Sequence, residues 1–151
     1  MTDLVVKLTK TINAPIEKVF NAWLNADTLS RFMMPIAGMP QPRVEADGRE
    51  GGSFTIYMMV GDNEIPHRGE YLEVNEPNKL VFTWESPFST DDSTVTILFN
   101  AIDKTTTEIN FTHIKFKDEQ TRSNHEGGWG TILEYLSTIS SPSTEQQKAS
   151  T

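Results

Sequence analysis

Three histidines, His67, His113 and His125, are the only side chains in this chain whose ordinary pKa suits acid and base chemistry at neutral pH. None of them lies in a recognisable catalytic motif. His113 alternates with Ile109 and Phe111, so all three should face the same side of a strand. If that side is concave, His113 either polarises a ligand carbonyl or is a buried histidine bonded to the backbone or to water.

His67 stands beside Arg68 and Glu70, and it could orient the polar end of a ligand. Gly69 makes the strand alternation ambiguous here, so the sequence leaves the face of His67 open. His125 precedes a glycine-rich helix entry, and no second ligand follows at a spacing typical of metal sites. We therefore expect no metal and no cofactor.

Composition excludes several other classes of function. The 151 residues contain no cysteine, which excludes disulfides, thiolate nucleophiles and cysteine-based metal sites. The formal charge of −8, without any basic cluster, argues against a nucleic-acid partner. No apolar stretch is long enough to span a membrane, and the N-terminus lacks a secretory signal, so we expect a cytoplasmic protein. Nucleotide-binding and hydrolase motifs are also missing.

Aromatic and methionine side chains are the strongest indication of a binding site. Indoles and flexible thioethers commonly line pockets for rings or acyl chains, although the same residues also fill ordinary cores. We expect them to surround an apolar or amphipathic small molecule. The predicted ligand-binding residues are Trp23, Phe32, Met34, Met58, His67, Tyr71, Trp84, His113, Trp129 and Leu133.

The first third of the chain should form one strand and two short helices. Residues 4–12 alternate as a half-buried strand does. Asn13 and Pro15 then resemble a helix cap and a first-turn proline, followed by apolar residues at helical spacing. Asp27 is the predicted cap of a second helix that ends before Pro35.

The middle of the chain should form an antiparallel sheet, because the connections are too short for parallel crossovers. After a loop rich in glycine and proline, with a brief strand at Arg43–Ala46, the expected strands are 53–60, 66–74, 80–85, 93–101 and 106–115.

A long helix should close the domain, because Trp129, Leu133 and Leu136 recur at helical spacing. Gly127 and Gly128 precede this stripe, so the helix either begins near Trp129 or uses the glycines to approach the sheet or a ligand closely. We expect one domain over residues 1–140 and a disordered tail over 141–151, which is polar and contains proline.

The ordered set of motifs resembles the START-like (SRPBCC) superfamily over residues 4–139. Within it, the chain is similar to homologues of the C-terminal domain of the activator of the ninety-kilodalton heat shock protein ATPase. The motifs that carry the resemblance are Asn13-Ala14-Pro15, Gly51-Gly52-Ser53-Phe54, His67-Arg68-Gly69-Glu70-Tyr71, Leu80-Val81-Phe82-Thr83-Trp84 and Gly128-Trp129. One departure is Phe32-Met33-Met34, where the family commonly has a tryptophan.

The resemblance implies an α+β helix-grip fold, in which a curved antiparallel sheet of about six strands wraps a long C-terminal helix and encloses a cavity. It also implies three alternative functions. The first is binding of a lipid-like, aromatic or polyketide-like small molecule. The second is a cyclase, dehydratase or small hydrolase in which His113 or Glu70 moves a proton. The third is contact with a heat-shock chaperone.

Overall fold

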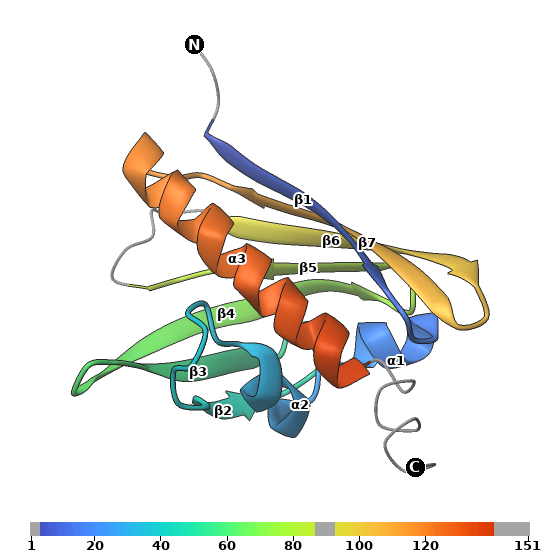
Figure 1. Ribbon diagram of the computed structural model, residues 1–151, viewed down its shortest axis with the longest axis horizontal. Helices are drawn as coiled ribbons and strands as arrows, with labels where there is room; N and C mark the ends of the chain where they lie inside the picture. Colours follow the sequence, from blue (N-terminus) through green and yellow to red (C-terminus); the bar gives the residue numbers. More distant parts are fainter. Residues whose placement is uncertain (1–3, 87–92, 141–151) are drawn as a thin grey trace.

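A computed structural model describes residues 4–86 and 93–140, with side-chain detail for all of these except Val60. The predicted tail, 141–151, lies outside the described residues. Along the chain the elements are β1 (Val5–Ile12), α1 (Ile16–Asn21), α2 (Ala26–Phe32), β2 (Arg43–Ala46), β3 (Ser53–Val60), β4 (Asn63–Asn75), β5 (Lys79–Thr83), β6 (Thr94–Asp103), β7 (Thr106–Ile114) and α3 (Glu119–Ser140) (Figure 1).

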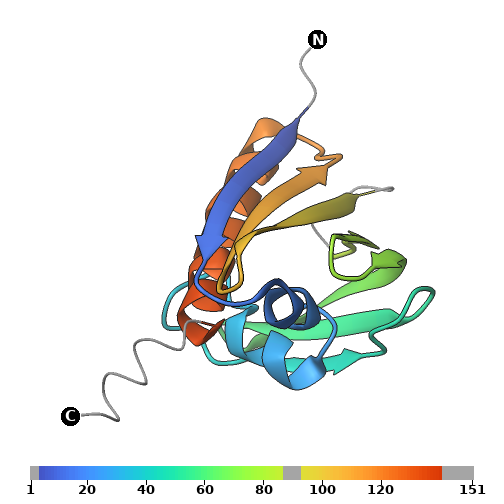
Figure 2. The same ribbon diagram turned by 90° about the vertical axis from the view of Figure 1, so that its right-hand side faces the viewer.

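The seven strands of the described residues form one antiparallel sheet in the order β1-β7-β6-β5-β4-β3-β2. This is one strand more than the approximate count that the resemblance implies. The sheet curves around α3, which lies across its concave face, while α1 and α2 close one end (Figures 1 and 2). The α+β helix-grip fold is therefore confirmed.

The burial pattern along the strands shows which side chains face the helix. In β7 every second residue from Thr107 to His113 is buried, so His113 points inward with Ile109 and Phe111 as predicted. In β4 the alternation stays regular through Gly69, and the register shift comes only after Tyr71. This regularity places His67 on the inner face.

The two short helices begin at different caps from those predicted. Asn25 caps α2, because its side-chain oxygen accepts a hydrogen bond from the backbone N–H of Thr28 over 3.0 Å. Asp27 lies inside the first turn instead. Pro15 precedes α1 with an extended backbone (ψ 150°), so Asn13 is too far from the helix to cap it.

Helix α3 begins ten residues before Trp129 and includes Gly127, Gly128 and Gly130. Asp118 stabilises this early start, since its carboxylate accepts a hydrogen bond from the backbone N–H of Thr121 over 2.8 Å. A Cβ added at Gly128 would meet the Cβ of Pro35 at 3.0 Å. The glycine therefore allows close approach to the loop after α2, a neighbour that neither alternative from the sequence had named.

The buried core lies between the concave face of the sheet, α3 and the two short helices. It is rich in aromatic rings, with Trp23 and Phe32 meeting edge to face at 5.0 Å and Phe111 and Trp129 at 4.6 Å between centroids. Within residues 4–86 and 93–140, no helix has the length and apolarity needed to cross a membrane.

Candidate functional site

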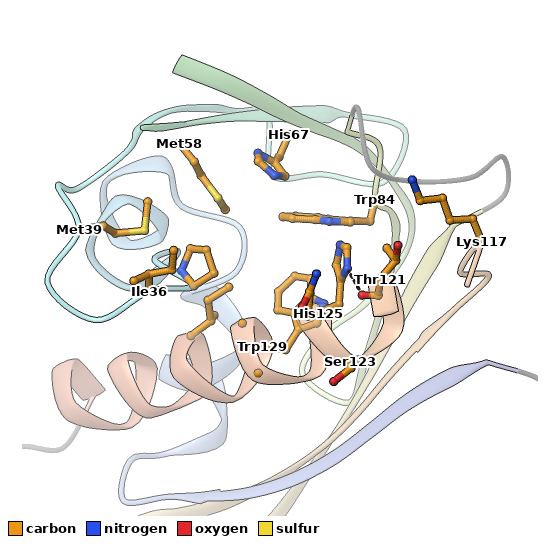
Figure 3. A pocket seen from close by; sticks show the side chains of 15 residues that line it. Ile36, Met39, Met58, His67, Trp84, Lys117, Thr121, Ser123, His125 and Trp129 are labelled. Atoms are coloured by element: carbon orange, nitrogen blue, oxygen red, sulfur yellow. Dashed lines mark hydrogen bonds between the residues drawn. The ribbon is translucent and has the colours of Figure 1, made fainter. Parts of the chain in front are cut away.

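A cavity of about 580 Å³ opens between the first half of α3, the inner face of the sheet and the loop after α2 (Figure 3). Its size falls in the range of small-molecule sites. Fifteen of the described residues line it: Pro35, Ile36, Met39, Met58, His67, Trp84, Lys117, Thr121, Ser123, Asn124, His125, Gly127, Gly128, Trp129 and Ile132.

The walls of the cavity are mainly apolar. Met58 reaches it from β3, Trp84 from the residue after β5, and Trp129 and Ile132 from α3. Trp84 and Trp129 are in ring contact, with centroids 4.8 Å apart. These side chains are almost fully buried, so they form a preformed surface on which an apolar body can rest.

The loop after α2 forms the rim of the cavity. Its Ile36 side chain is 62% exposed, although it is large and apolar. The loop is fastened to α3, because the backbone N–H of Gly38 donates a hydrogen bond to the hydroxyl of Tyr135 over 3.1 Å. Exposed apolar surface beside a cavity is typical of a ligand entrance.

Two of the three histidines project into the cavity, His67 from β4 and His125 from α3 (Figure 3). Nδ1 of His67 donates to the carbonyl of Ile65 over 3.1 Å, and Nδ1 of His125 donates to the carbonyl of Thr121 over 2.8 Å. In each neutral ring the other nitrogen, Nε2, then carries a lone pair that can accept a hydrogen bond.

Burial keeps both rings in the neutral form. Desolvation lowers the pKa of His67, which the hydrogen bond to Ile65 partly opposes and the charge of a protonated His125 would reinforce. Desolvation also lowers the pKa of His125, against the opposing hydrogen bond to Thr121. At neutral pH the cavity therefore presents uncharged imidazoles.

Trp84 leaves an indole N–H without a partner. Its Nε1 atom is buried and finds no acceptor in the part of the chain that the structure describes. The ring instead lies against His67, with centroids 5.4 Å apart, and against Trp129. An unsatisfied buried donor of this kind is uncommon in folded proteins, and functional sites are one place where it occurs.

His113 does not line the cavity, because it is fully buried behind Trp129. The indole N–H of Trp129 donates to Nδ1 of His113 over 3.0 Å, and Nε2 of His113 lies 2.7 Å from the hydroxyl oxygen of Ser93. With a donor facing Nδ1, the neutral ring carries its proton on Nε2 and donates it to Ser93.

This tautomer has a chemical consequence. A catalytic histidine must accept the proton of a serine hydroxyl at Nε2, and a carboxylate usually holds the other nitrogen protonated. In this protein Trp129 imposes the opposite arrangement on His113, and burial lowers the pKa of His113 to about 3. The Ser93 and His113 pair therefore has no general base for nucleophilic attack.

Of the ten predicted ligand-binding residues, Met58, His67, Trp84 and Trp129 line the cavity. The other six are buried in the surrounding packing, and whether they affect binding stays a prediction. They are Trp23, Phe32, Met34, Tyr71, His113 and Leu133. Tyr71 illustrates a structural role, since its hydroxyl donates to the carbonyl of Trp23 over 2.7 Å and burial raises its pKa.

The predicted set omits several residues that line the cavity, among them Ile36, Met39, His125 and Ile132. A signal was available for two of these. His125 and Ile132 stand four residues before and three residues after Trp129, so all three share a helix face. The rim residues had no such signal, because an irregular loop has no period.

Solved structures with the same fold come from several organisms. CV1439 from Chromobacterium violaceum has a TM-score of 0.79 and 21% identity, covering 91% of this chain and 97% of that one. ChR145 from Cytophaga hutchinsonii has a TM-score of 0.72 and 26% identity over the whole of both chains. PFC0360w, an HSP90 activator from Plasmodium falciparum, has a TM-score of 0.72 and 24% identity, covering 89% and 94%.

No curated protein sequence matches the chain. The family model described as activator of Hsp90 ATPase homolog 1-like protein matches residues 13–140, which span α1 to the end of α3 and so include every residue that lines the cavity. Together with the helix-grip fold, this match shows that the chain belongs to the family of activator of Hsp90 ATPase homolog 1-like proteins, within the START-like superfamily.

Proposed function

We propose that this protein binds an apolar or aromatic small molecule in the cavity between α3 and the sheet. The observation that carries the proposal is a preformed cavity of about 580 Å³ whose walls combine Met58, Trp84 and Trp129 with two neutral histidines. A compact core needs no such opening. Displacement of water from the apolar walls of the cavity by a ligand is favourable.

The expected affinity is modest. Burial of a two-ring or three-ring compound against indoles and thioethers supports a dissociation constant in the micromolar range, about −8 kcal/mol. Met58 and Met39 are flexible and adapt to irregular shapes, so we expect several related compounds to bind.

A titration with N-phenyl-1-naphthylamine tests the proposal, because this neutral probe becomes brighter in apolar surroundings. The wild-type protein should show one saturable site that also changes tryptophan emission. Met39→Trp should weaken binding about tenfold, since the larger side chain fills part of the rim. Leu98→Trp is the matched control, because Leu98 is 47% exposed on β6 and does not line the cavity.

Chemical-shift mapping of the bound probe locates the site. Perturbations should centre on the indole N–H signals of Trp84 and Trp129 and on the first half of α3. Absence of saturation, or equal losses in the Met39→Trp and Leu98→Trp variants, would contradict binding in this cavity.

A second candidate function is stimulation of a heat-shock ATPase. It is supported by the family match and by the similarity to PFC0360w, which is described as an HSP90 activator. The test is the ATPase rate of purified Hsp90 with and without this chain. An increase that persists when N-phenyl-1-naphthylamine occupies the cavity would favour a chaperone role that is separate from ligand binding.

A further inference from the structure

The polar groups of the cavity restrict the chemistry of its ligand. His67 and His125 both donate from Nδ1 to backbone carbonyls, so their rings are held in one orientation and one tautomer. Their Nε2 atoms face no donor among residues 4–86 and 93–140. Both histidines therefore present hydrogen-bond acceptors to whatever occupies the cavity.

The surfaces next to these acceptors are aromatic. The ring of His67 lies 5.4 Å from that of Trp84, which in turn contacts Trp129 (Figure 3). A planar ring can stack on this surface, and a hydroxyl on its edge can then point toward an imidazole. A saturated acyl chain gains nothing specific from either feature.

Resting on the proposed function, we infer that the ligand class is a neutral aromatic compound carrying a hydroxyl group, whose proton is donated to Nε2 of His67 or His125. The two histidines are then specificity-determining residues. They discriminate against analogues without the hydroxyl, because a site built to accept a hydrogen bond leaves its acceptor unpaired when the donor is missing.

A carboxylate fits this site less well. It offers only acceptors, so it cannot pair with Nε2 of either neutral imidazole, and protonation of these rings is opposed by their burial. Lys117 is the one cationic side chain that lines the described cavity, and it is exposed at the mouth. Its charge is therefore largely solvated.

The experiment compares 2-naphthol with 2-methoxynaphthalene by calorimetry at pH 7.5. The two compounds share the same rings and the same oxygen, and methylation replaces the donor hydrogen by a methyl group. Wild-type protein should bind 2-naphthol about tenfold more tightly than the ether. His125→Leu and His67→Leu should each reduce this ratio of affinities. Substitution of the histidine that accepts the hydrogen bond should bring the ratio close to one.

Two further variants act as controls. His125→Gln keeps a hydrogen-bond acceptor and should retain part of the preference, which a purely structural role would not explain. Thr138→Leu changes an exposed residue of α3 outside the cavity and should keep the wild-type ratio. Thermal melting of each variant establishes that it is folded, and His125 is the safer site because it is only partly buried.

The possible outcomes separate the two proposals. Equal affinities for 2-naphthol and the ether would overturn the inference about the hydroxyl while leaving the proposed function intact. Tighter binding of 2-naphthoate than of 2-naphthol would also overturn it, in favour of an anion site. Failure of all three compounds to bind, together with N-phenyl-1-naphthylamine, would instead reject the proposed function itself.

Discussion

Trp129 donates its indole N–H to Nδ1 of His113 across the interface between α3 and β7, over 3.0 Å. Both side chains are at most 2% exposed. The bond joins helix to sheet directly behind the cavity, and it sets the tautomer of the histidine, whose pKa is lowered by burial. One contact therefore positions a wall of the binding site and prevents Nε2 of His113 from serving as a general base.

The first prediction concerns the loss of this donor. Trp129→Phe should destabilise the protein by about 2 to 4 kcal/mol, because it removes apolar volume and also leaves Nδ1 of His113 buried without a partner. Urea unfolding measures the change.

Trp84→Phe is the matched control for this prediction. The chemical change is identical, but the indole N–H of Trp84 has no acceptor among the described residues, so no partner is stranded. We expect Trp84→Phe to lower the free energy of unfolding by less than Trp129→Phe does, the difference being about 1 kcal/mol or more. Equal losses in the two variants would mean that the hydrogen bond to His113 contributes nothing measurable.

The second prediction concerns the loss of stability at acidic pH. The pKa of His113 is lowered from 6.5 to about 3 in the folded state, first by burial and then by His125. The unfolded chain therefore takes up a proton before the native protein does, and stability is complete above pH 6.5 and falls as the pH decreases toward 3. His67 and His125 act with the same sign.

The measurement is the free energy of unfolding between pH 6.5 and 4.5. The carboxylates with lowered pKa values, Asp103, Asp118 and Glu119, act with the same sign, and their contribution is smallest in the upper part of this window. His113→Gln should reduce the pH slope by up to about 1.4 kcal/mol per pH unit. An unchanged slope would show that His113 is protonated in the folded protein.

The third prediction concerns the glycines of α3. Gly130→Ala should stabilise the protein by about 0.5 to 1 kcal/mol, because a Cβ there meets nothing within 4 Å and alanine favours the helix. Gly128→Ala should give less or none of this gain, since its Cβ would press on Pro35 at 3.0 Å. Thermal melting of both variants measures the change in stability. Equal increases in stability would argue against a tight contact between Gly128 and the rim.

The fourth prediction separates packing from binding along α3. Leu133→Ala should destabilise by about 2 to 5 kcal/mol with little change in probe affinity, because Leu133 is buried but does not line the cavity. Ile132→Ala should alter the affinity for N-phenyl-1-naphthylamine as well, since Ile132 does line it. Equal effects on affinity would support the ligand-binding role that the sequence predicts for Leu133.

Much of the fold follows from local patterns in the sequence. β2 and β3 have the bounds expected from the glycine, proline and turn residues around them, and the inward direction of His113 follows from its phase with Ile109 and Phe111. Turn residues and a side-chain period of two are both local features of the sequence. The start of α3 was less determined, because glycine disfavours a helix locally while Asp118 and the contact with Pro35 support it.

The binding site depended on tertiary structure. Trp23 and Trp84 are both large, buried and inward-facing, yet only Trp84 lines the cavity. The difference arises because the helices α1 and α2 cover one end of the concave face (Figure 2), while the cavity opens between the loop after α2, the sheet and the first half of α3. The sequence determined which side chains turn inward, since strand and helix periods are local. Which of them border empty space was decided by how distant elements pack, because a cavity is a property of their separation and of no single segment.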